Sequence, residues 1–395
     1  MAVTTIEERQ TAGAGFMTEA REVLEALLPG LDERLAAEQL QDLERRGGPG
    51  LPAFKECGGP GLLAPKERGG IGASPFEAIQ VQRAIASRSP SVAIGTNMHH
   101  LSIASFVESL EAGYPDDAPE WALVQGIAEN NLLVSSALAE GRSGVSNMKP
   151  TVRAERRGEE FVVNGSKKPC SLSSSMQLFS GTVVIEGDDP NAGKVAFVII
   201  PVGTPGMEVR EFWQSPVLAG AESDEVVFND VVIPEGLVVT TEMRPGEDMD
   251  PLLIRGWTWF EVLMLGAYVG LASGLLERVL LAGKGSEADI GEMGTELEAA
   301  MSAAEGIAHR LAGGMDPARM LPHALLVRYS VQRAVVEVTN RAADVLGGIA
   351  FITDPDVAYL VSAARALAFH PPSRGKGLPA LGRYVQGEPF DTKVF

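Results

Sequence analysis

The stretch that most constrains the fold runs from Thr151 to Ser175 and reads TVRAERRGEEFVVNGSKKPCSLSSS. Charged and apolar residues alternate up to Phe161–Val163, as expected of a β-strand with one buried face. The Asn164-Gly165 pair, which lies between two strand-like runs, predicts a tight hairpin turn. After this pair come lysines, a proline and several serines, which are poor residues for the centre of a sheet. Such residues could form a polar wall against a planar ligand, although a solvated edge strand would have the same composition.

The segments on either side of this stretch are helical in pattern. Apolar residues recur three and four positions apart over residues 14–130 and again after Pro251, whereas residues 132–245 alternate with period two. The predicted strands are Thr182–Ile185, Val195–Ile200, Met207–Phe212 and Glu225–Val232. The predicted helices after the strands are Pro251–Leu281, Ile290–Leu311, Pro317–Leu346 and Asp356–Leu367. Segregated helices and strands predict an α+β protein, with domains at 1–130, 131–245 and 246–395.

Composition bounds the function further. The chain has 395 residues, 45% of them hydrophobic, and a net charge of −19, which predicts a soluble protein of two or three domains. So negative a chain is an improbable partner for nucleic acid. Cys57 and Cys170 alone cannot build a disulfide framework, so a reducing cytoplasm is favoured, and no His/Cys cluster has the spacing of a metal site.

Neither a leader nor a membrane segment is expected. The first ten residues, MAVTTIEERQ, lack the basic and apolar regions of a signal peptide. The apolar run Val262–Leu276 is shorter than the roughly 20 residues that span a bilayer, so we expect a buried helix of a soluble protein.

Three glycines in the predicted helix Pro251–Leu281 recur every four residues and therefore share one face: Gly266, Gly270 and Gly274. Each costs about 1 kcal/mol relative to alanine inside a helix. Close approach of another helix would offset that cost, and we expect such packing here. The alternative is that the glycines have no packing role and the helix simply tolerates them. Tight packing of this region also suits self-association.

Three sequence motifs and their order resemble the acyl-CoA dehydrogenase superfamily of flavoenzymes. They are VVNGSKKPCSLSSS, GAESDEVVFNDVVIP at Gly220–Pro234, and ADVLGGIAFITDPDVAYLVSAARALAF at Ala343–Phe369. The resemblance implies an N-terminal α domain, a middle β-barrel and a C-terminal four-helix bundle. It also implies a flavin between barrel and bundle, and a homodimer or homotetramer.

On the barrel side, the resemblance implies that Pro169 replaces an aromatic residue and that Ser171 places its hydroxyl beside flavin N5. Ser136 and Cys170 would complete this wall. A hydroxyl suits that position because it can donate to or accept from a nitrogen whose protonation changes with redox state. The alternative for Ser171 is a solvated strand residue, and Cys170 is expected to pack rather than react.

On the bundle side, Leu346, Gly347 and Gly348 resemble the turn whose backbone approaches the flavin pyrophosphate, where glycine allows close contact. A simple helix C-cap is the alternative. Ser373 and Arg374 could bind the flavin phosphates, because guanidinium groups suit phosphate oxygens, although a solvated helix end fits equally.

The chain departs from the family at the catalytic base. Most members carry a glutamate shortly after the Leu-Gly-Gly helix, and Pro371 stands in its place here. Other members carry the base on the first bundle helix, where Phe260 matches and Glu261 is one residue further on. Glu261 would then serve as the base of an acyl-CoA or acyl-carrier-protein dehydrogenase, or be a polar residue that pairs with Arg255.

Two sequence motifs that bind the flavin in most members of the family are also missing from this sequence. The usual acidic and glycine-rich loop is replaced by Ala137–Gly144, and the Arg-x-x-Phe-Gly run is absent from Ala282–Gly291. Fewer anchors suit a reduced flavin that a separate reductase delivers, as in the two-component monooxygenases of the superfamily. The cofactor would be FAD, bound as FADH2, with FMN as the alternative. Reaction with O2 would give a C4a-hydroperoxide that must be shielded from water.

This resemblance predicts hydroxylation of an aromatic, indole-like or amine small molecule in a specialised pathway. The imidazoles of His370 and His100 are candidates beside the peroxide and substrate, because their pKa lies near operating pH. Predicted substrate contacts are His99, Trp259, Phe260 and Met264. Packing in the core is the alternative for each of these residues. A non-catalytic flavin-binding or carrier-binding protein on a decayed enzyme fold is the third hypothesis.

Overall fold

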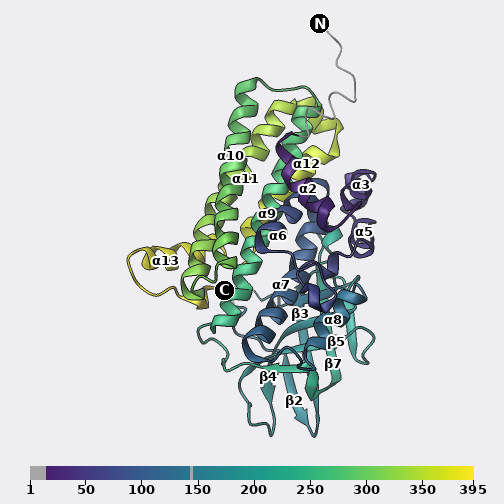
Figure 1. The fold of residues 1–395 in the computed structure, drawn as a ribbon, viewed down its shortest axis with the longest axis vertical. Helices are drawn as coiled ribbons and strands as arrows, with labels where there is room; N and C mark the ends of the chain where they lie inside the picture. Colours follow the sequence, from purple (N-terminus) through teal and green to yellow (C-terminus); the bar gives the residue numbers. More distant parts are fainter. Residues whose placement is uncertain (1–14, 143–145) are drawn as a thin grey trace.

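The computed structural model describes residues 15–142 and 146–395. The stretch inspected for a signal peptide and two residues of the substituted barrel loop, Ser143 and Gly144, lie outside the described residues. Helices from both ends of the chain pack together above a sheet formed by the middle of the chain (Figure 1). The elements change from helix to strand between Glu129 and Val134, and back to helix between Thr240 and Pro251.

The N-terminal helices are α2 Thr18–Leu27, α3 Leu31–Ala36, α4 Leu40–Leu43, α5 Gly50–Glu56, α6 Pro75–Arg88, α7 Pro90–Gly113 and α8 Trp121–Glu129. The start of α6 is fixed by a capping box, in which Ser74 accepts from the Glu77 amide and the Glu77 side chain accepts from the Ser74 amide. The start of α7 is fixed by Ser89, whose hydroxyl accepts from the Val92 amide. These two helices carry the buried residues that meet the bundle.

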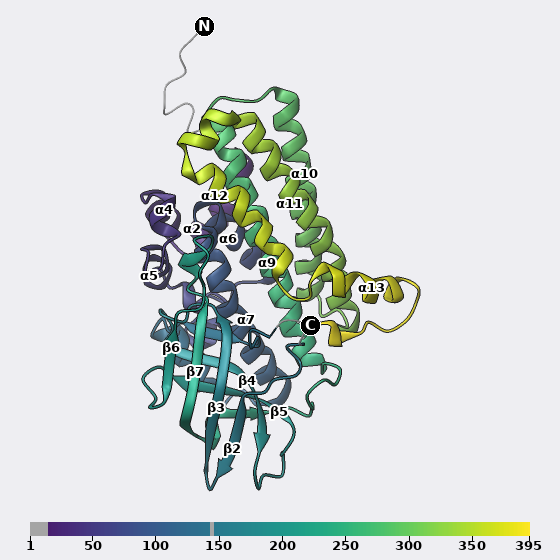
Figure 2. The same ribbon diagram turned by 180° about the vertical axis from the view of Figure 1, so that it is seen from behind.

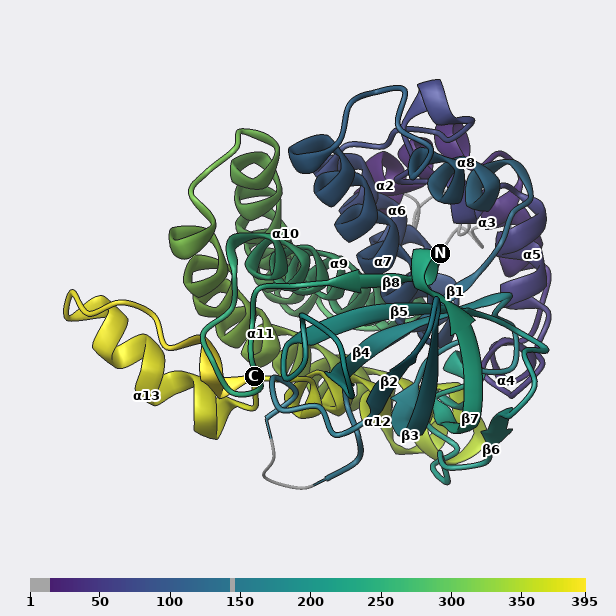
Figure 3. The same ribbon diagram turned by 90° about the horizontal axis from the view of Figure 1, so that it is seen from below.

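The middle sheet consists of β1 Val134–Ala137, β2 Arg153–Arg157, β3 Glu160–Cys170, β4 Leu178–Glu186, β5 Val195–Pro201, β6 Met207–Arg210, β7 Asp224–Pro234 and β8 Val238–Thr240. Its order is β6-β7-β3-β2-β4-β5-β8, with β1 paired parallel to β4. Seen from below, the strands cross beneath the N-terminal helices and the bundle (Figure 3). The sheet has a separate apolar core, centred on residues such as Phe179 and Phe228.

The predicted hairpin turn at Asn164-Gly165 is wrong. Antiparallel β2 and β3 pair Arg157 with Glu160, so the turn lies at Gly158-Glu159. Gly158 has φ +67°, which glycine adopts easily. Asn164 and Gly165 lie inside β3, at a register shift against β7, and Gly165 has φ +132°. A β-bulge and a hairpin turn both require such backbone angles, so the Asn-Gly pair alone does not show which of the two it forms.

The C-terminal helices are α9 Pro251–Leu281, α10 Glu287–Ala312, α11 Pro317–Thr353, α12 Pro355–Ala364 and α13 Arg374–Val385. Helix α9 lies at the centre of the molecule and packs against α6, α7, α10 and α11. It is apolar and long enough to cross a membrane by composition, but the whole of its apolar window is buried inside the protein, as in a soluble core helix. Helix α13 projects from the side of the bundle (Figures 1 and 2).

The glycine face of α9 packs directly on helix α6. A Cβ added to Gly266 or Gly274 would lie 2.6 Å from a backbone oxygen of α6, and one added to Gly270 would come closer still. The opposing carbonyl groups belong to Ile79, Arg83 and Ser87. Close helix packing, as predicted, therefore explains the glycines. The contact joins the N-terminal domain to the bundle of the same chain.

We expect Gly270→Ala to lower the free energy of unfolding by about 2–3 kcal/mol, because the added methyl group must push two helix backbones apart. Gly306→Ala in α10 is the matched control, since a Cβ there meets no atom within 4 Å. That control should raise the free energy of unfolding by about 0.5–1 kcal/mol through helix propensity. Chemical denaturation of both variants measures the difference, and equal effects would contradict the packing argument.

Candidate functional site

Hydroxyl groups gather where β3 ends and the chain turns back. The Ser171 hydroxyl lies 3.0 Å from that of Ser223, and the Ser135 hydroxyl donates to the Ser171 carbonyl at 2.6 Å. Ser136 follows on the same strand, β1, which packs against α7. Cys170 is fully buried, and this burial raises the pKa of its thiol to about 12, so it is a packing residue as expected.

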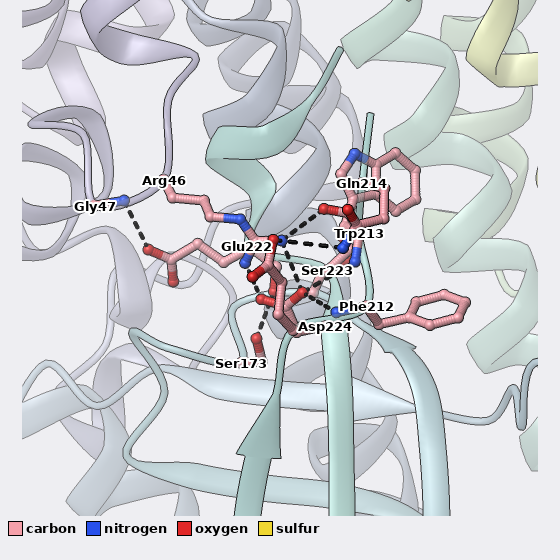
Figure 4. A network of polar contacts seen from close by, with 11 residues as sticks. Arg46, Gly47, Ser173, Phe212, Trp213, Gln214, Glu222, Ser223 and Asp224 are labelled. Atoms are coloured by element: carbon pink, nitrogen blue, oxygen red, sulfur yellow. Dashed lines mark hydrogen bonds and ion pairs between the residues drawn. The ribbon is translucent and has the colours of Figure 1, made fainter. Parts of the chain in front are cut away.

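The loop that carries Ser223 is fixed by an ion-pair network (Figure 4). Arg46 forms an ion pair with Asp224 and donates to the Trp213 carbonyl at 2.8 Å. One Asp224 oxygen also accepts from the backbone amides of Phe212 and Trp213, at 2.8 and 3.1 Å. On the other side of Ser223, the Glu222 carbonyl accepts from the Ser173 hydroxyl at 2.7 Å. Ser223 is therefore held on both sides in the position where it meets Ser171.

A cavity of about 310 Å³ opens beside Pro169. Its walls come from the segment Leu138–Arg142, from Lys168, and from Ser146, Asn147, Lys149 and Pro150. Three of the side chains in these walls are cationic. Lys168 pairs with Glu225 at 2.9 Å and Arg142 pairs with Glu140 at 2.6 Å. The third, Lys149, makes no ion pair within the described part of the chain. A cavity of this size and charge suits the phosphate end of an anionic ligand.

Beneath this cavity, Lys167 and Glu140 form a buried ion pair. The Lys167 ammonium is fully buried and lies 3.0 Å from Glu140 Oε1. Burial alone would raise the pKa of Glu140, but the Lys167 charge and hydrogen bonds from Thr151 outweigh it and lower that pKa to about 2. Lys167 is therefore a structural residue of the barrel, and is not part of the polar ligand wall predicted for this run.

The ion pair between Lys167 and Glu140 should make the free energy of unfolding fall in acid. Because the pKa of Glu140 is lower in the folded protein, its contribution is complete above about pH 4.5 and is lost as pH falls towards 2. We expect this contribution to be about 2 kcal/mol, discounted for the part of the carboxylate that water reaches. Glu140→Gln should flatten that part of the unfolding-versus-pH curve. An unchanged curve in the variant would show that other carboxylates carry the acid dependence.

On the bundle side, the segment after α12 is held over α9 by one arginine. Arg328 of α11 is fully buried, and its guanidinium donates to the carbonyls of Leu367, His370 and Pro371. It also donates to Glu261 Oε1 at 2.8 Å. The alternative partner predicted for Glu261, Arg255, is wrong, because Arg255 pairs with Glu108. Burial raises the pKa of Glu261 to about 7, although Arg328 opposes that shift.

His370 is oriented by its neighbours on α9. Its Nε2 lies 2.9 Å from the Tyr268 hydroxyl, and its ring contacts Phe260 edge-on with centroids 5.9 Å apart. Burial and the Arg328 charge lower the pKa of His370 to about 3. The imidazole is therefore neutral at physiological pH. It can exchange one hydrogen bond with a ligand but carries no charge there.

The two histidines of α7 face away from this cluster. His99 Nδ1 accepts from the Val134 amide at 3.0 Å, and its Nε2 lies 2.9 Å from the Pro60 carbonyl. Both ring nitrogens are therefore used by the backbone, and the predicted substrate contact of His99 stays a prediction. His100 is also fully buried, packs edge-on against Phe54, and has no hydrogen-bond partner among the described residues. The structure does not bring His100 together with His370, so its catalytic role stays a prediction.

The predicted substrate contacts on α9 separate into two groups. The Trp259 indole donates to Glu108 at 2.7 Å and lines a different cavity, of about 530 Å³, with Arg255. Phe260 instead contacts the ring of His370, and the substrate contacts of these residues stay predictions. The reason for the separation is helix geometry, because adjacent residues point about 100° apart. Met264 is buried, and its sulfur accepts from Asn97 at 3.1 Å.

The other predicted flavin residues lie at the edge of the bundle. Gly347 interrupts α11 with φ +83° and ψ +166°, and the helix then resumes to Thr353, so it is more than a terminal cap. The Leu346 carbonyl accepts from Lys284, and a Cβ on Gly347 or Gly348 would meet no atom within 4 Å. Arg374 follows Ser373 at the start of α13 and donates to the Tyr329 carbonyl at 3.2 Å. Flavin contacts of these residues stay predictions.

Sequence reasoning missed Arg328 and Tyr268, which organise the bundle side. A signal for Arg328 exists, since it is the one charge in the apolar run Ala324–Val331 of α11. A charge inside such a run needs a buried partner or a ligand. Its partners lie 39 to 67 residues away in the chain, so sequence spacing could not name them.

Comparison with known proteins agrees with this architecture. The acyl-CoA dehydrogenase middle-domain profile matches residues 135–231, and the profile of the acyl-CoA dehydrogenase C-terminal domain matches residues 276–370. Isobutylamine N-hydroxylase of Streptomyces viridifaciens is 38% identical over 373 residues, which cover 94% of this chain and 98% of that protein. The chain therefore belongs to the acyl-CoA dehydrogenase superfamily of flavoenzymes. The predicted resemblance and the α+β fold are confirmed.

Solved structures of low sequence identity share the fold. Nitrososynthase from Micromonospora carbonacea var. africana aligns with a TM-score of 0.81 and 20% identity over 93% of this chain and 97% of its own. FMN-bound TdsC from Paenibacillus sp. A11-2 aligns with a TM-score of 0.77 and 20% identity over 96% of this chain and 98% of its own. Together with the N-hydroxylase, these relatives place the chain among the flavin-dependent oxidoreductases of the superfamily, on its monooxygenase side.

Proposed function

We propose that this protein is a flavin-dependent monooxygenase that hydroxylates the nitrogen of a small alkyl amine in a specialised pathway. It would use O2 and a reduced flavin that a separate reductase supplies. Of the predicted substrate classes, the amine is favoured by the likeness to isobutylamine N-hydroxylase across nearly the whole chain. Aromatic and indole-like substrates are the less favoured classes.

One observation carries the proposal. Pro371, which replaces the glutamate base of the family's dehydrogenases, has its carbonyl fixed by Arg328 at 2.8 Å. The segment therefore presents a neutral imidazole, His370, and no carboxylate at the usual place. A reaction that begins by removing a proton from carbon needs such a carboxylate, whereas oxygen transfer to an amine nitrogen does not.

The residues of the barrel end fit a flavin. Ser171 is only partly buried, so its hydroxyl can reach a ring nitrogen. Ser136 follows Ser135, whose hydroxyl donates to the Ser171 carbonyl, on β1. The cavity beside Pro169 could hold the phosphate end, with Lys149 as its cation without an ion-pair partner in the described part of the chain. When bound, the reduced flavin would supply the electrons that activate O2 for transfer of one oxygen atom.

The chain's own residues would then orient the substrate and exclude water. Phe260 and Trp257 are buried and give apolar walls for a short alkyl chain. Tyr268 keeps His370 oriented, and the neutral imidazole could exchange a hydrogen bond with the amine nitrogen or with the transferred oxygen. A shielded site favours oxygen transfer over loss of reduced oxygen species to solvent.

The remaining assignments follow the same proposal. We assign FAD as the flavin, with FMN as the alternative, and a homodimer or homotetramer in the cytoplasm. The two free cysteines, Cys57 and Cys170, support a reducing compartment. Flavin choice is tested by equilibrium titration of the protein with reduced FAD and reduced FMN under anaerobic conditions.

The proposal is tested with purified protein, a flavin reductase, NADH, flavin, O2 and isobutylamine. We expect a product that has gained one oxygen atom and reacts as a hydroxylamine. In 18O2 the product should carry the heavy isotope, whereas label from H2(18)O should be absent. Formation of peroxide alone with every amine, phenol and indole offered would refute the proposal.

A dehydrogenase of acyl thioesters is the second candidate, and one observation favours it. Glu261 lies fully buried beside Phe260, and its raised pKa of about 7 would suit a base. This candidate predicts that butyryl-CoA bleaches protein-bound oxidised flavin anaerobically and yields crotonyl-CoA. The monooxygenase proposal predicts no bleaching.

A further inference from the structure

Glu261 is the buried acidic group that the proposed reaction has not yet used. It is buried in α9, with an exposed fraction of 0%. Trp257 and Tyr268 lie four and seven positions from Glu261 and share its face of the helix, whereas Phe260 is the adjacent residue and points about 100° away. Tyr268 and Phe260 both contact the ring of His370. Glu261 therefore belongs to the wall on which the predicted substrate would lie.

Only one of the two carboxylate oxygens of Glu261 has a hydrogen-bond partner in the described part of the chain. Its Oε1 accepts from Arg328, whereas its Oε2 is buried and has no hydrogen-bond partner among the described residues. An unpaired buried polar atom destabilises the folded protein, and more strongly so if it is charged. Such an atom is expected to receive a donor from a ligand or a water molecule. A single donor from Arg328 also leaves both lone pairs of Oε2 free.

A line of aromatic contacts connects this wall to the cavity beside Pro169. The Asn147 amide at the cavity donates to the Phe395 carbonyl at 3.1 Å, and the Phe395 ring lies 4.4 Å from that of Trp257. The Trp257 ring in turn contacts Phe260, with centroids 5.4 Å apart. A series of apolar rings therefore runs from the Asn147 side of the cavity to Phe260, which precedes Glu261 on α9. An alkyl chain with a terminal donor complements a wall of this kind.

We propose that Glu261 Oε2 receives the amino group of the substrate and accepts its proton. This inference rests on the proposed N-hydroxylation and names the substrate class of that site, a primary alkylammonium ion. In the step, R–NH3+ and the Glu261 carboxylate become R–NH2 and the Glu261 carboxylic acid. The nitrogen lone pair set free by this transfer is the nucleophile that oxygen transfer requires.

The electrostatic surroundings agree with this role. The charged and titratable groups around Glu261 are Arg328 and Tyr329 of α11, Tyr268 of α9, and His370 of the following segment. His370 is neutral and both tyrosines are un-ionised near pH 7, because burial lowers the pKa of the histidine and raises that of each tyrosine. Among the described residues, Arg328 is thus the fixed charge that acts on the carboxylate. A carboxylate whose pKa lies near neutrality can hold or release a proton at the pH of the cell.

The test is calorimetric titration of protein saturated with oxidised flavin, using isobutylamine and its uncharged counterpart isobutanol. Glu261→Gln should weaken isobutylamine binding by about 100-fold, because it removes a charge-assisted hydrogen bond, and leave isobutanol within about twofold. The matched control is Glu277→Gln on the same helix, where a largely buried carboxylate pairs with Arg21. That control should leave both ligands unchanged.

A second measurement needs no variant. Isobutylamine binding to the wild-type protein, titrated in buffers of different ionisation enthalpy, should release close to one proton well below pH 7 and almost none well above it. The reason is that one proton must leave when an ammonium ion meets a protonated carboxyl group. Proton release that does not vary with pH would overturn the assignment of Glu261, as would unchanged amine affinity in a folded Glu261→Gln protein.

The assignment of Glu261 and the proposed N-hydroxylation can be refuted separately. If the wild-type protein converts amines to hydroxylamines but Glu261→Gln binds them normally, the assignment of Glu261 is refuted and the proposed function stands. If no amine is oxygenated by the wild-type protein, the proposed function is refuted whatever the binding data show.

Discussion

Replacing Arg328 by methionine is expected to lower the free energy of unfolding by about 3–5 kcal/mol, because removing one member of a buried ion pair leaves the other charge uncompensated. Arg328 and Glu261 are both essentially inaccessible to water, at 1% and 0% exposure. The change also removes donors from three carbonyl groups, so the segment that carries His370 should lose its fixed position. Chemical denaturation, followed by tryptophan fluorescence, measures the loss.

The matched control is Arg255→Met, which removes a partly exposed arginine from its pair with Glu108. It should cost no more than about 1 kcal/mol, as is usual for pairs that solvent reaches. In the Arg328→Met background, Glu261→Gln should recover part of the stability, because it removes the stranded charge. A stability loss at Arg328 no larger than that at Arg255 would contradict the description of Arg328 as the clamp of this segment.

Replacing His370 by alanine is expected to reduce hydroxylated product by about 100-fold, because the site loses the imidazole that exchanges a hydrogen bond with the amine nitrogen or the transferred oxygen. Oxygen consumption should continue, with the missing product recovered as peroxide. The pKa of His370 is lowered to about 3, so the wild-type profile above pH 5 should show no ionisation of this residue. Product yield per O2 consumed, measured across that pH range, tests both statements.

His323→Ala is the control, because this histidine lies on α11 and contacts Arg310 rather than the site. It should leave the coupling of O2 to product unchanged. If the His370→Ala protein forms as much product per O2 consumed as the wild-type protein does, the imidazole only fills space. Tyr268→Phe would then be expected to have no effect either, since its hydroxyl acts through His370.

The elements most predictable from the chain are those with strong local signals. Helix α9 has the bounds that the helical pattern after Pro251 predicts, and the structure adds that Asp250 caps its first turn. The three glycines on one face of α9 also predict that another helix packs closely there, and that helix is α6. The Asn164-Gly165 pair shows the limit of local rules, because a bulge uses the same backbone freedom as a turn.

The candidate site was harder to predict because its contacts are distant in sequence. Proximity of Ser171 to Ser223 depends on the pairing of β3 with β7, and that of Glu261 to Arg328 on the packing of α9 against α11. His99 belonged to the predicted site by residue type, yet two backbone partners occupy its ring. The residue type alone does not reveal whether the polar atoms of a side chain already have hydrogen-bond partners within the protein.

The central claim is that this fold transfers an oxygen atom rather than removing hydrogen from carbon. It is tested most directly by the mass of the product formed from isobutylamine with reduced flavin and 18O2. The account predicts a hydroxylamine that carries one heavy oxygen atom. Unaltered amine, together with conversion of an acyl thioester to its enoyl product in the same preparation, would contradict it.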